Sequence, residues 1–379
     1  MAKSYRADHV GSLLRPPELL AARQAFDEKR LSAERLREVE DRAIVKALAA
    51  QKDAGLSIFS DGEYRRGIWY GPLGHAIEEA LIADPSPLPQ PSNVGWQGRG
   101  ADLAREMMTE VSGNDVVVGR KITNPRRLTG HESAFLKQHA PGDWKITMPG
   151  VMHRAPNWFR KGVTDAFYST REALIDELVG LVQKEVAALI EEGVSYIQLD
   201  SLIYVLTLND PGRRQQLVDA GIDLDSYLDE VIKVDNACLA GARRAGVTVG
   251  LHMCRGNNRS AWAAAGSYEM AEKAFQQLDV DRFLLEYDTE RAGSFEPLRF
   301  VPRDKMVVLG LISSKEPALE PVDELLRQIE AAAKYVPLEN LAISPQCGFA
   351  STYQGNLLSW DDQQRKLALI VETARRAWG

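Results

Sequence analysis

Eight short apolar runs, most of them followed by a helical pattern, constrain the fold of this chain more than any other feature. Each run is almost continuously apolar, which is typical of parallel strands buried on both faces. The predicted strands are Arg6–Gly11, Leu56–Ser60, Trp144–Pro149, Tyr196–Asp200, Val247–Met253, Phe283–Tyr287, Met306–Ile312 and Leu341–Ser344. Eight such units favour an α/β fold, a closed parallel (β/α)8 TIM barrel whose chemistry lies on the loops after the strands.

Two helices and one insertion complete this expectation. A helix is predicted over Arg171–Glu192, with Gly193 as its C-terminal cap, and a last helix over Asp361–Trp378. The stretch from about residue 61 to residue 143 is too long for one crossover. We interpret it as an insertion after the second strand, with a helix and a β-hairpin that cover part of the active face. Its Pro-rich tract, residues 85–91, is predicted to be a surface linker. We expect one catalytic barrel domain over residues 1–379.

The composition narrows the class of protein. Of the 379 residues, 45% are hydrophobic and 26% are charged, as in ordinary globular proteins. The net charge of -7 gives no reason to expect nucleic acid or an anionic membrane as a partner. The chain has no run of 18 or more apolar residues, no apolar N-terminal stretch, and only three cysteines. These features predict a cytoplasmic protein with reduced thiols and no membrane span.

Two of the three cysteines lie where a metal ion could use them. His252 and Cys254 come at the end of one predicted strand, Glu286 at the end of the next, and Cys347 directly after the last. The carboxyl ends of parallel barrel strands meet at one mouth, so these side chains are expected to converge. Imidazole, thiolate and carboxylate together form a typical set of zinc ligands.

Each of these residues taken alone has a simpler interpretation. Cys254 and Cys347 could be small buried hydrophobic residues and His252 a hydrogen-bonded core residue, since free cysteine is commonly buried and inert. The joint placement after predicted strands favours the metal. Cys238 lies inside a helical pattern and is predicted to belong to the core.

Three more polar residues are expected at the same mouth. Ser12, Glu63 and Asp200 follow or end predicted strands. Two carboxylates and a hydroxyl near a metal could hold the ammonium group of an amino-acid substrate, with Glu63 and Asp200 as catalytic candidates. The alternatives are a helix N-cap for Ser12 and a surface salt bridge from Glu63 to Arg65 or Arg66.

The motifs around these residues resemble those of cobalamin-independent methionine synthase, in its C-terminal catalytic half. The resemblance covers essentially the whole chain, and the order of the motifs agrees. The motifs are His9-Val10-Gly11-Ser12, Gly62-Glu63, Gln198-Leu199-Asp200, His252-Met253-Cys254, Glu286 and Ser344-Pro345-Gln346-Cys347-Gly348.

This resemblance implies a zinc-dependent barrel enzyme of methionine biosynthesis that methylates a thiol. It implies zinc ligands at His252, Cys254, Glu286 and Cys347. It also implies that Ser12, Glu63 and Asp200 hold the amino-acid part of homocysteine, which reacts as a zinc-bound thiolate. The partners would be this small thiol and a methyl donor, either a folate or a corrinoid.

Departures from the family pattern concern the methyl donor. The family's Asp-Glu-Pro-Ala tract reads Asp200-Ser201-Leu202-Ile203 here, so its second acid is missing. Its His-Ser-Pro segment reads Ile312-Ser313-Ser314-Lys315-Glu316-Pro317, so its histidine is missing as well. Both missing groups belong to the family's handling of the folate leaving group. The thiol half of the chemistry is therefore better supported than the folate half.

Three alternatives stay open at this point. A related branch resembles epoxyalkane:coenzyme M transferase, whose thiol carries a sulfonate that Arg65, Arg66 or Arg255 could bind. A barrel of the decarboxylase-like kind would need no metal, because fold alone does not determine function. A purely structural zinc module would use the same ligands without catalysis, although such sites usually have ligands close together in sequence.

Overall fold

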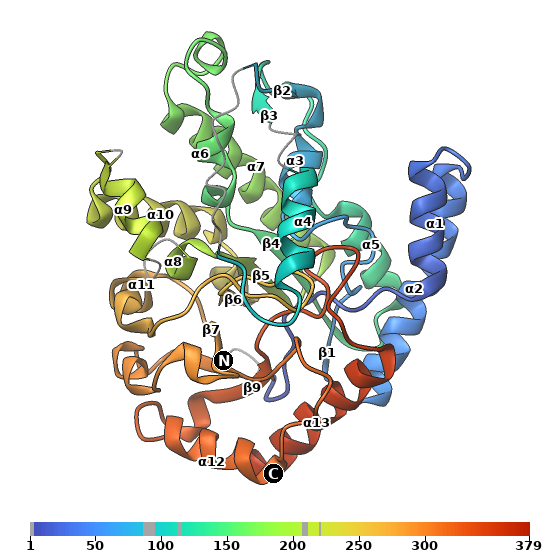
Figure 1. Ribbon diagram of the computed structural model, residues 1–379, viewed down its shortest axis with the longest axis vertical. Helices are drawn as coiled ribbons and strands as arrows, with labels where there is room; N and C mark the ends of the chain where they lie inside the picture. The colour runs from blue at the N-terminus through green and yellow to red at the C-terminus, as the bar shows by residue number, and fades with distance from the viewer. Residues whose placement is uncertain (1–3, 86–94, 112–115, 207–210, 220) are drawn as a thin grey trace.

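Seven parallel strands curl into the wall of a barrel in the computed structural model, which describes residues 4–85, 95–111, 116–206, 211–219 and 221–379 (Figure 1). The order of the strands in the sheet follows their order in the chain, as right-handed crossovers produce. The strands are β1 (Ile58–Phe59), β4 (Asp143–Pro149), β5 (Tyr196–Asp200), β6 (Thr248–Met253), β7 (Arg282–Glu286), β8 (Met306–Ile312) and β9 (Leu341–Pro345). The predicted (β/α)8 barrel class is confirmed, with the strand ends within about two residues of the prediction.

The first predicted strand, Arg6–Gly11, is the exception. It is reduced to a single parallel bridge between Ala7 and Ile343 on β9. Toward β1 the contact is made by a side chain, because His9 Nε2 lies 3.2 Å from the carbonyl oxygen of Ile58. Gly11 has φ 131, where the chain leaves extended conformation. The seam of the barrel is thus closed by side chains rather than by a full ladder.

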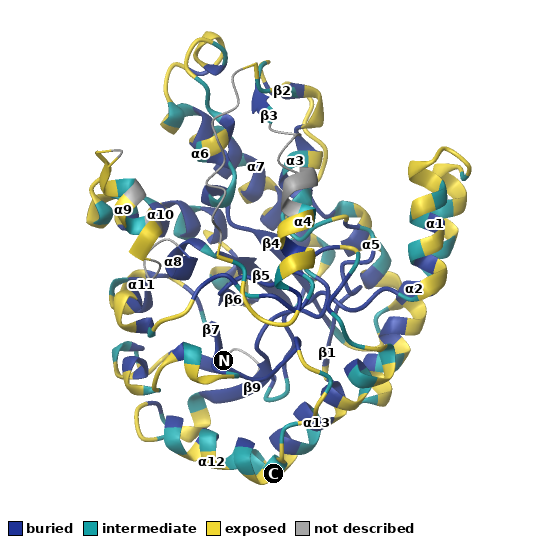
Figure 2. Cartoon of the chain, viewed as in Figure 1, coloured by how far each residue is buried: buried dark blue, intermediate teal, exposed yellow. Residues whose placement is uncertain are grey.

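Helices cover the outside of the barrel, with buried faces toward the strands and exposed faces toward solvent (Figure 2). The predicted helix α7 (Arg171–Glu192) is confirmed: Thr170 caps its first turn, and Gly193 ends it with φ 89. The last helix, α13, begins one residue earlier than predicted, at Trp360, and ends at Trp378. The other helices of at least eight residues are α1 (Pro17–Asp27), α2 (Ala33–Asp53), α4 (Ala101–Val111), α5 (Gly130–His139), α9 (Pro211–Asp219), α10 (Leu224–Leu239) and α12 (Val322–Ala332).

The insertion after β1 contains the expected β-structure, but not as a tight hairpin. Strands β2 (Leu81–Ala83) and β3 (Val116–Val118) pair antiparallel, and α4 lies between them in the chain. Gln97, just before α4, exchanges two backbone hydrogen bonds of 2.9 and 3.0 Å with Trp262 in the loop after β6. The insertion therefore covers part of the barrel mouth, as predicted (Figure 1). Most of the predicted Pro-rich linker lies outside the described residues.

The opposite end of the barrel is filled by a cluster of charged and aromatic side chains, here named the floor cluster: Tyr5, Asp8, Lys145, Tyr196 and Arg282. The Asp8 carboxylate accepts a 2.9 Å hydrogen bond from Lys145 Nζ and one of 3.4 Å from Arg282. The rings of Tyr5 and Tyr196 stack with centroids 5.9 Å apart. These side chains belong to the first residues of the strands, far along each strand from the mouth.

Among the described helices, none is long and apolar enough to cross a membrane.

Candidate metal centre

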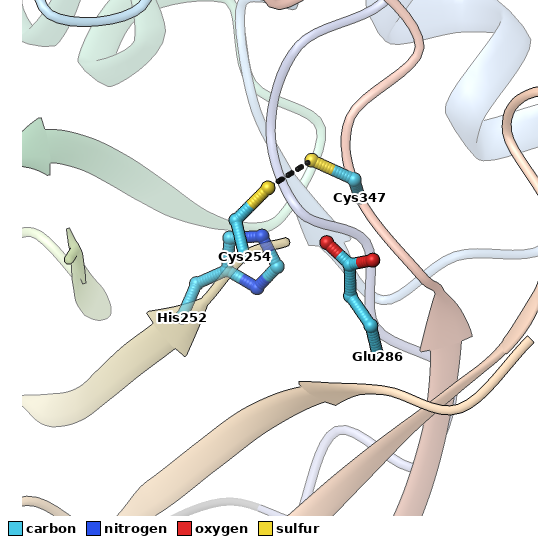
Figure 3. Close-up of side chains that lie close together, drawn as sticks. All are labelled: His252, Cys254, Glu286 and Cys347. Carbon is cyan, nitrogen blue, oxygen red and sulfur yellow. Dashed lines mark hydrogen bonds between the residues drawn. The ribbon is translucent and has the colours of Figure 1, made fainter. Parts of the chain in front are cut away.

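Four side chains from three strand ends converge at the mouth of the barrel (Figure 3). His252 and Cys254 come from the end of β6, Glu286 from the end of β7, and Cys347 from the loop after β9. Their ligand atoms all lie within 4.8 Å of one another, and all four side chains are buried. The sequence prediction that these residues converge is confirmed. Cys238, in contrast, is buried in α10 and lies outside this group.

The orientation of His252 suits a metal ligand. Its Nδ1 lies 3.2 Å from the carbonyl oxygen of Leu284 on the neighbouring strand β7. A carbonyl only accepts, so Nδ1 carries a proton and Nε2 is the nitrogen that would bind a metal ion. Burial lowers the pKa of His252, but Cys347 outweighs burial and raises that pKa to about 9, so a metal ion would displace a proton from Nε2. Nε2 is buried and has no hydrogen-bond partner among the described residues. Nε2 is therefore the atom of His252 that can bind a metal ion, and it points into the group of four candidate ligands.

The other three side chains are held by a second layer of contacts. Glu286 accepts hydrogen bonds from the backbone of Arg255 at 2.7 Å and from Arg291 Nη2 at 3.1 Å. The backbone N–H of Gly256 lies 3.2 Å from Cys254 Sγ. Such contacts orient the ligands before any ion arrives. Burial raises the pKa of Glu286, but Lys315 and Arg291 outweigh it and lower that pKa overall.

The donor set fits a zinc ion. The sulfurs of Cys254 and Cys347 lie 3.4 Å apart, too far for a disulfide and close to the roughly 3.8 Å that tetrahedral zinc with Zn–S bonds of about 2.3 Å requires. The hydrogen bond between them holds the pKa of the Cys347 thiol well below its usual range and raises that of Cys254. Two sulfurs, one free imidazole nitrogen and one carboxylate are a soft, mixed set that selects zinc over magnesium or calcium.

The three predicted substrate residues line the same mouth. Ser12 Oγ accepts a 3.3 Å hydrogen bond from the backbone of Ala350, and a Cβ at Gly348 would lie 1.9 Å from that oxygen. Ser12 therefore touches the loop that carries Cys347. It does not cap a helix, because α1 begins after Pro16 without a side-chain cap. The N-cap alternative is wrong.

Glu63 is buried at the end of the first loop and is not part of a surface salt bridge. Its Oε1 accepts a 2.8 Å hydrogen bond from Thr147 and lies 3.6 Å from Arg66 Nη1, with both charged side chains buried. Its backbone has φ 58, a strained conformation that is typical of functional positions. Arg65 pairs with Glu40 and Asp41 instead. The surface-bridge alternative is therefore corrected to a buried contact with Arg66.

Asp200 ends β5 with its Oδ1 2.7 Å from Gln198 Nε2. Burial raises its pKa to about 7, with His252 opposing the rise and the charge of Glu63 adding to it. Burial also raises the pKa of Glu63, against the lowering by Arg66. Two buried carboxylates, of which Glu63 raises the pKa of Asp200, favour a cation near them. An ammonium group is a cation of this kind.

Some polar residues of the mouth were absent from the sequence prediction. Thr147 links Glu63 to Arg66, and Asp61 holds the backbone of Glu63 at 2.9 Å. Lys315 and Gln346 are buried beside the metal group. The signal that could have found them is the one used for the ligands: each lies on a barrel strand or in the segment directly after one.

The comparisons with known proteins agree with this geometry. The profile described as "Cobalamin-independent synthase, Catalytic domain" matches residues 164–376. The chain belongs to the cobalamin-independent methionine synthase family. It is 34% identical over 99% of its length to the uncharacterized protein YxjH of Bacillus subtilis strain 168, and the match covers 95% of YxjH. Membership places it among methyltransferases.

Two further comparisons concern a named enzyme and a solved fold. The chain is 28% identical to a methionine synthase of Pyrococcus abyssi, over 55% of this chain and 51% of that one. A Listeria monocytogenes protein provisionally assigned as a vitamin-B12-independent methionine synthase superimposes with a TM-score of 0.70 at 25% identity, covering 100% of this chain and 99% of its own. The superposition shows that the Listeria protein shares the fold that positions the candidate metal centre in this chain.

Proposed function

We propose that the protein is a zinc-dependent methyltransferase that methylates the thiol of homocysteine. One observation carries this proposal: His252, Cys254, Glu286 and Cys347 place their ligand atoms within 4.8 Å of one another at the mouth of the barrel. The ligands come from distant parts of the sequence and include a carboxylate, which suits an exchangeable catalytic site better than a structural one. Family membership supports methyl transfer as the reaction class.

In this proposal the two sides of the mouth have separate roles. His252, Cys254, Glu286 and Cys347 would hold the zinc ion. When bound, zinc supplies the Lewis acidity that keeps a thiol deprotonated at neutral pH. Glu63 and Asp200 hold the ammonium group of homocysteine, and Ser12 positions the same substrate beside the Cys347 loop. Ordering the amino acid this way presents its sulfur to the incoming methyl group.

The proposed reaction balances as thiol plus methyl donor giving thioether, demethylated donor and one proton. The S–CH3 bond forms as the bond between the methyl carbon and the donor breaks, and the thiol proton ends on the leaving group or in solvent. The donor is a methylated folate or a methylated corrinoid. The buried, covered mouth excludes water from the reacting sulfur, which protects the nucleophile from protonation.

Metal analysis of the purified full-length chain is the first test. We expect one zinc per chain after purification in chelator-free buffer, and loss of methyl transfer after treatment with a strong chelator. The far-UV circular dichroism spectrum should stay unchanged, because the barrel core does not include the ligands. Zinc well below one per chain, with activity that chelation leaves intact, would falsify the proposal. A chelator that unfolds the chain would favour a structural zinc module.

The identity of the thiol is tested by X-ray absorption at the zinc edge. Homocysteine should add one sulfur to the metal shell, and coenzyme M should not, since the buried carboxylates of Glu63 and Asp200 favour an ammonium group and repel a sulfonate. A sulfur added by coenzyme M instead would favour the epoxyalkane:coenzyme M transferase alternative. Cys238→Ala is the matched control, because this cysteine lies outside the metal group and its loss should leave both spectra unchanged.

A further inference from the structure

Two buried hydrogen-bond donors beside the metal group lack an acceptor among the described residues. Lys315 follows β8 and is 3% exposed, and its Nζ has no hydrogen-bond partner among the described residues. Gln346, directly before Cys347, is 1% exposed, and its Nε2 also lacks a partner there. Burying an ammonium or an amide group without a hydrogen-bond partner costs on the order of several kcal/mol. Such groups therefore call for a ligand that accepts hydrogen bonds.

The backbone around both donors is fixed before any ligand arrives. The backbone N–H and the hydroxyl of Ser314 both donate to Gln346 Oε1 at 2.8 Å, so the oxygen end of this amide is used and its nitrogen end is free. Asn356 Nδ2 donates to the carbonyl of Ser314 at 2.8 Å. The N–H of Lys315 lies 3.3 Å from Ser313 Oγ. A site assembled in this way binds without first having to order its own groups.

The two carboxylates near Lys315 each have one oxygen held by Arg291, while Asp288 Oδ2 has no hydrogen-bond partner among the described residues. Arg291 Nη2 bridges Glu286 Oε2 at 3.1 Å and Asp288 Oδ1 at 2.7 Å. Burial raises the pKa of Asp288, while Arg291 and then Lys315 lower it, so the ammonium of Lys315 lies in the same cluster. Its charge is thus close to the metal group but hydrogen-bonded to none of the described side chains. Burial raises the pKa of Glu286, a candidate metal ligand, but Lys315 lowers that pKa, so the Lys315 charge acts at the metal group.

The position of Lys315 in the barrel separates it from the proposed amino-acid pocket. Strand β8 lies between β7, which carries Glu286, and β9, which precedes Cys347. Asp200 and Glu63 follow β5 and β1, on the other side of the ring of strands. A thiol held by these two carboxylates leaves the β8 side for the second reactant. The donor of the methyl group is that reactant.

We propose that Lys315 and Gln346 form an anion subsite that binds a carboxylate, phosphate or sulfonate group carried by the methyl donor. This inference rests on the proposed function, because it assigns the second reactant of that reaction. An oxyanion accepts from both the ammonium and the amide nitrogen in charge-assisted hydrogen bonds. The donor therefore carries a negative group within reach of its methyl carbon, and a donor without one is a poor substrate.

Binding of simple anions to the zinc-loaded full-length protein tests the subsite without turnover. Sulfate stands in for phosphate and sulfonate, and acetate for carboxylate, each titrated at constant ionic strength with chloride as the balancing anion. At least one of the two should raise the melting temperature in a saturable way. Lys315→Met should weaken that binding roughly 10- to 100-fold, the range expected for a lost hydrogen bond to a charged group.

Three further variants serve as two controls and a second test of the subsite. Lys315→Arg retains the charge and should retain most of the binding. Gln346→Glu keeps the oxygen that Ser314 needs but replaces the free donor by a second oxygen, so it should weaken anion binding. Lys334→Met removes one exposed positive charge elsewhere and should change nothing. Equal binding in the wild type and in Lys315→Met, or saturable binding of neither anion, would overturn the subsite.

The source of the anion is decided by adding saturating homocysteine. If the subsite serves the methyl donor, sulfate or acetate binds as well with homocysteine present as without it. If homocysteine displaces the anion, Lys315 binds the carboxylate of the amino acid itself and the inference is wrong. Failure of the proposed function would show separately, as missing zinc or missing sulfur coordination. The difference in anion binding between wild type and the Lys315 and Gln346 variants reports on this subsite without requiring turnover.

Discussion

The two ends of the barrel both bury charged side chains, but they pair them differently. At the floor cluster, the Asp8 carboxylate accepts from both Lys145 and Arg282, so each charged side chain has an opposite charge as a partner. The neutral hydroxyl of Tyr196 is left there without a hydrogen-bond partner among the described residues. At the mouth, His252 Nε2 and Lys315 Nζ are equally buried and keep no hydrogen-bond partner among the described residues. The difference shows that the floor end of the barrel stabilises the fold, whereas the mouth is arranged to bind ligands. Buried pairs hold a structure together, whereas buried single groups await a partner.

The strongest test of this contrast removes a charge from the floor cluster. Lys145→Met leaves the Asp8 carboxylate buried with the 3.4 Å contact to Arg282 and the 2.8 Å hydrogen bond from the backbone N–H of His9, and breaking a buried pair costs about 3–5 kcal/mol. We expect a loss of that size in the free energy of unfolding, measured by urea denaturation, with the zinc content unchanged. Lys334→Met, an exposed control, should lie within about 0.5 kcal/mol of wild type. A loss of less than 1 kcal/mol in Lys145→Met would mean that the floor pairing does not stabilise the barrel.

The pH dependence of stability should have opposite sign at the two ends. Burial raises the pKa of Asp8, but Lys145 and Arg282 outweigh it and lower that pKa, so Asp8 stabilises the fold above its unfolded pKa and less as the pH falls. Burial raises the pKa of Asp61 to about 6 from 3.8, so its folded form binds more protons and stability falls as the pH rises from about 4 to about 6.

Asp61→Asn removes the cost of burying that charge. The free energy of unfolding of Asp61→Asn, relative to that of the wild type, should therefore rise by about 3 kcal/mol between pH 4 and pH 7. This value follows from about 1.4 kcal/mol for each pH unit by which burial raises the pKa, a rise of roughly two units. Urea denaturation of both proteins at the two pH values measures the difference. The same change in wild type and variant, with no pH-dependent gap, would show that the Asp61 carboxyl is not held in its neutral form.

At the mouth, losing a metal ligand should affect zinc binding more than folding. Cys347→Ser removes one sulfur from the group of four, and we expect zinc affinity and methyl transfer to fall by more than about 100-fold, beyond the 10- to 100-fold typical of outer-shell changes. Zinc content by mass spectrometry and a methyl-transfer assay measure the two effects. Cys238→Ala should keep both. Full zinc content in Cys347→Ser would remove this cysteine from the ligand set.

The acidic side of the mouth should act on the amino acid and not on the metal. Glu63→Gln removes one charge from the pair that faces the ammonium group, and we expect the KM for homocysteine to rise about tenfold. The zinc content should stay at one per chain. 3-Mercaptopropionate, a thiol without an amino group, should react equally with both proteins. If its KM rises as well, Glu63 supports the metal group rather than the substrate.

Most of the barrel could be predicted from the sequence. The strands β4 to β9 are continuous apolar runs, and local periodicity reports such runs directly. The first predicted strand was reduced to one bridge because Asp8 and His9 turn their side chains inward to pair with Lys145 and the β1 backbone. The apolar pattern of residues 6–11 gives no indication of this pairing. The insertion was located correctly, but α4 between its two strands could not be derived from alternation alone.

The candidate site divides in the same way. The four metal ligands were found because each belongs to the end of an apolar run, and parallel strands bring such ends together. Lys315 and Gln346 also follow strands, yet nothing local distinguishes a buried lysine without a partner from an exposed one. Whether Glu63 paired with Arg66 at the surface or inside the mouth likewise depended on distant residues, since Thr147 on β4 and Glu132 on α5 hold the two side chains in the interior.

By itself, the amino-acid sequence determined the alternation of strands and helices, the set of soft ligands, and the family to which its motifs correspond. Only the tertiary structure decided which buried polar atoms are paired and which are not. The physical reason is that pairing is a property of distances between segments far apart in the chain. Whether a charge stabilises the fold or waits for a ligand follows from those distances, and no local pattern contains them.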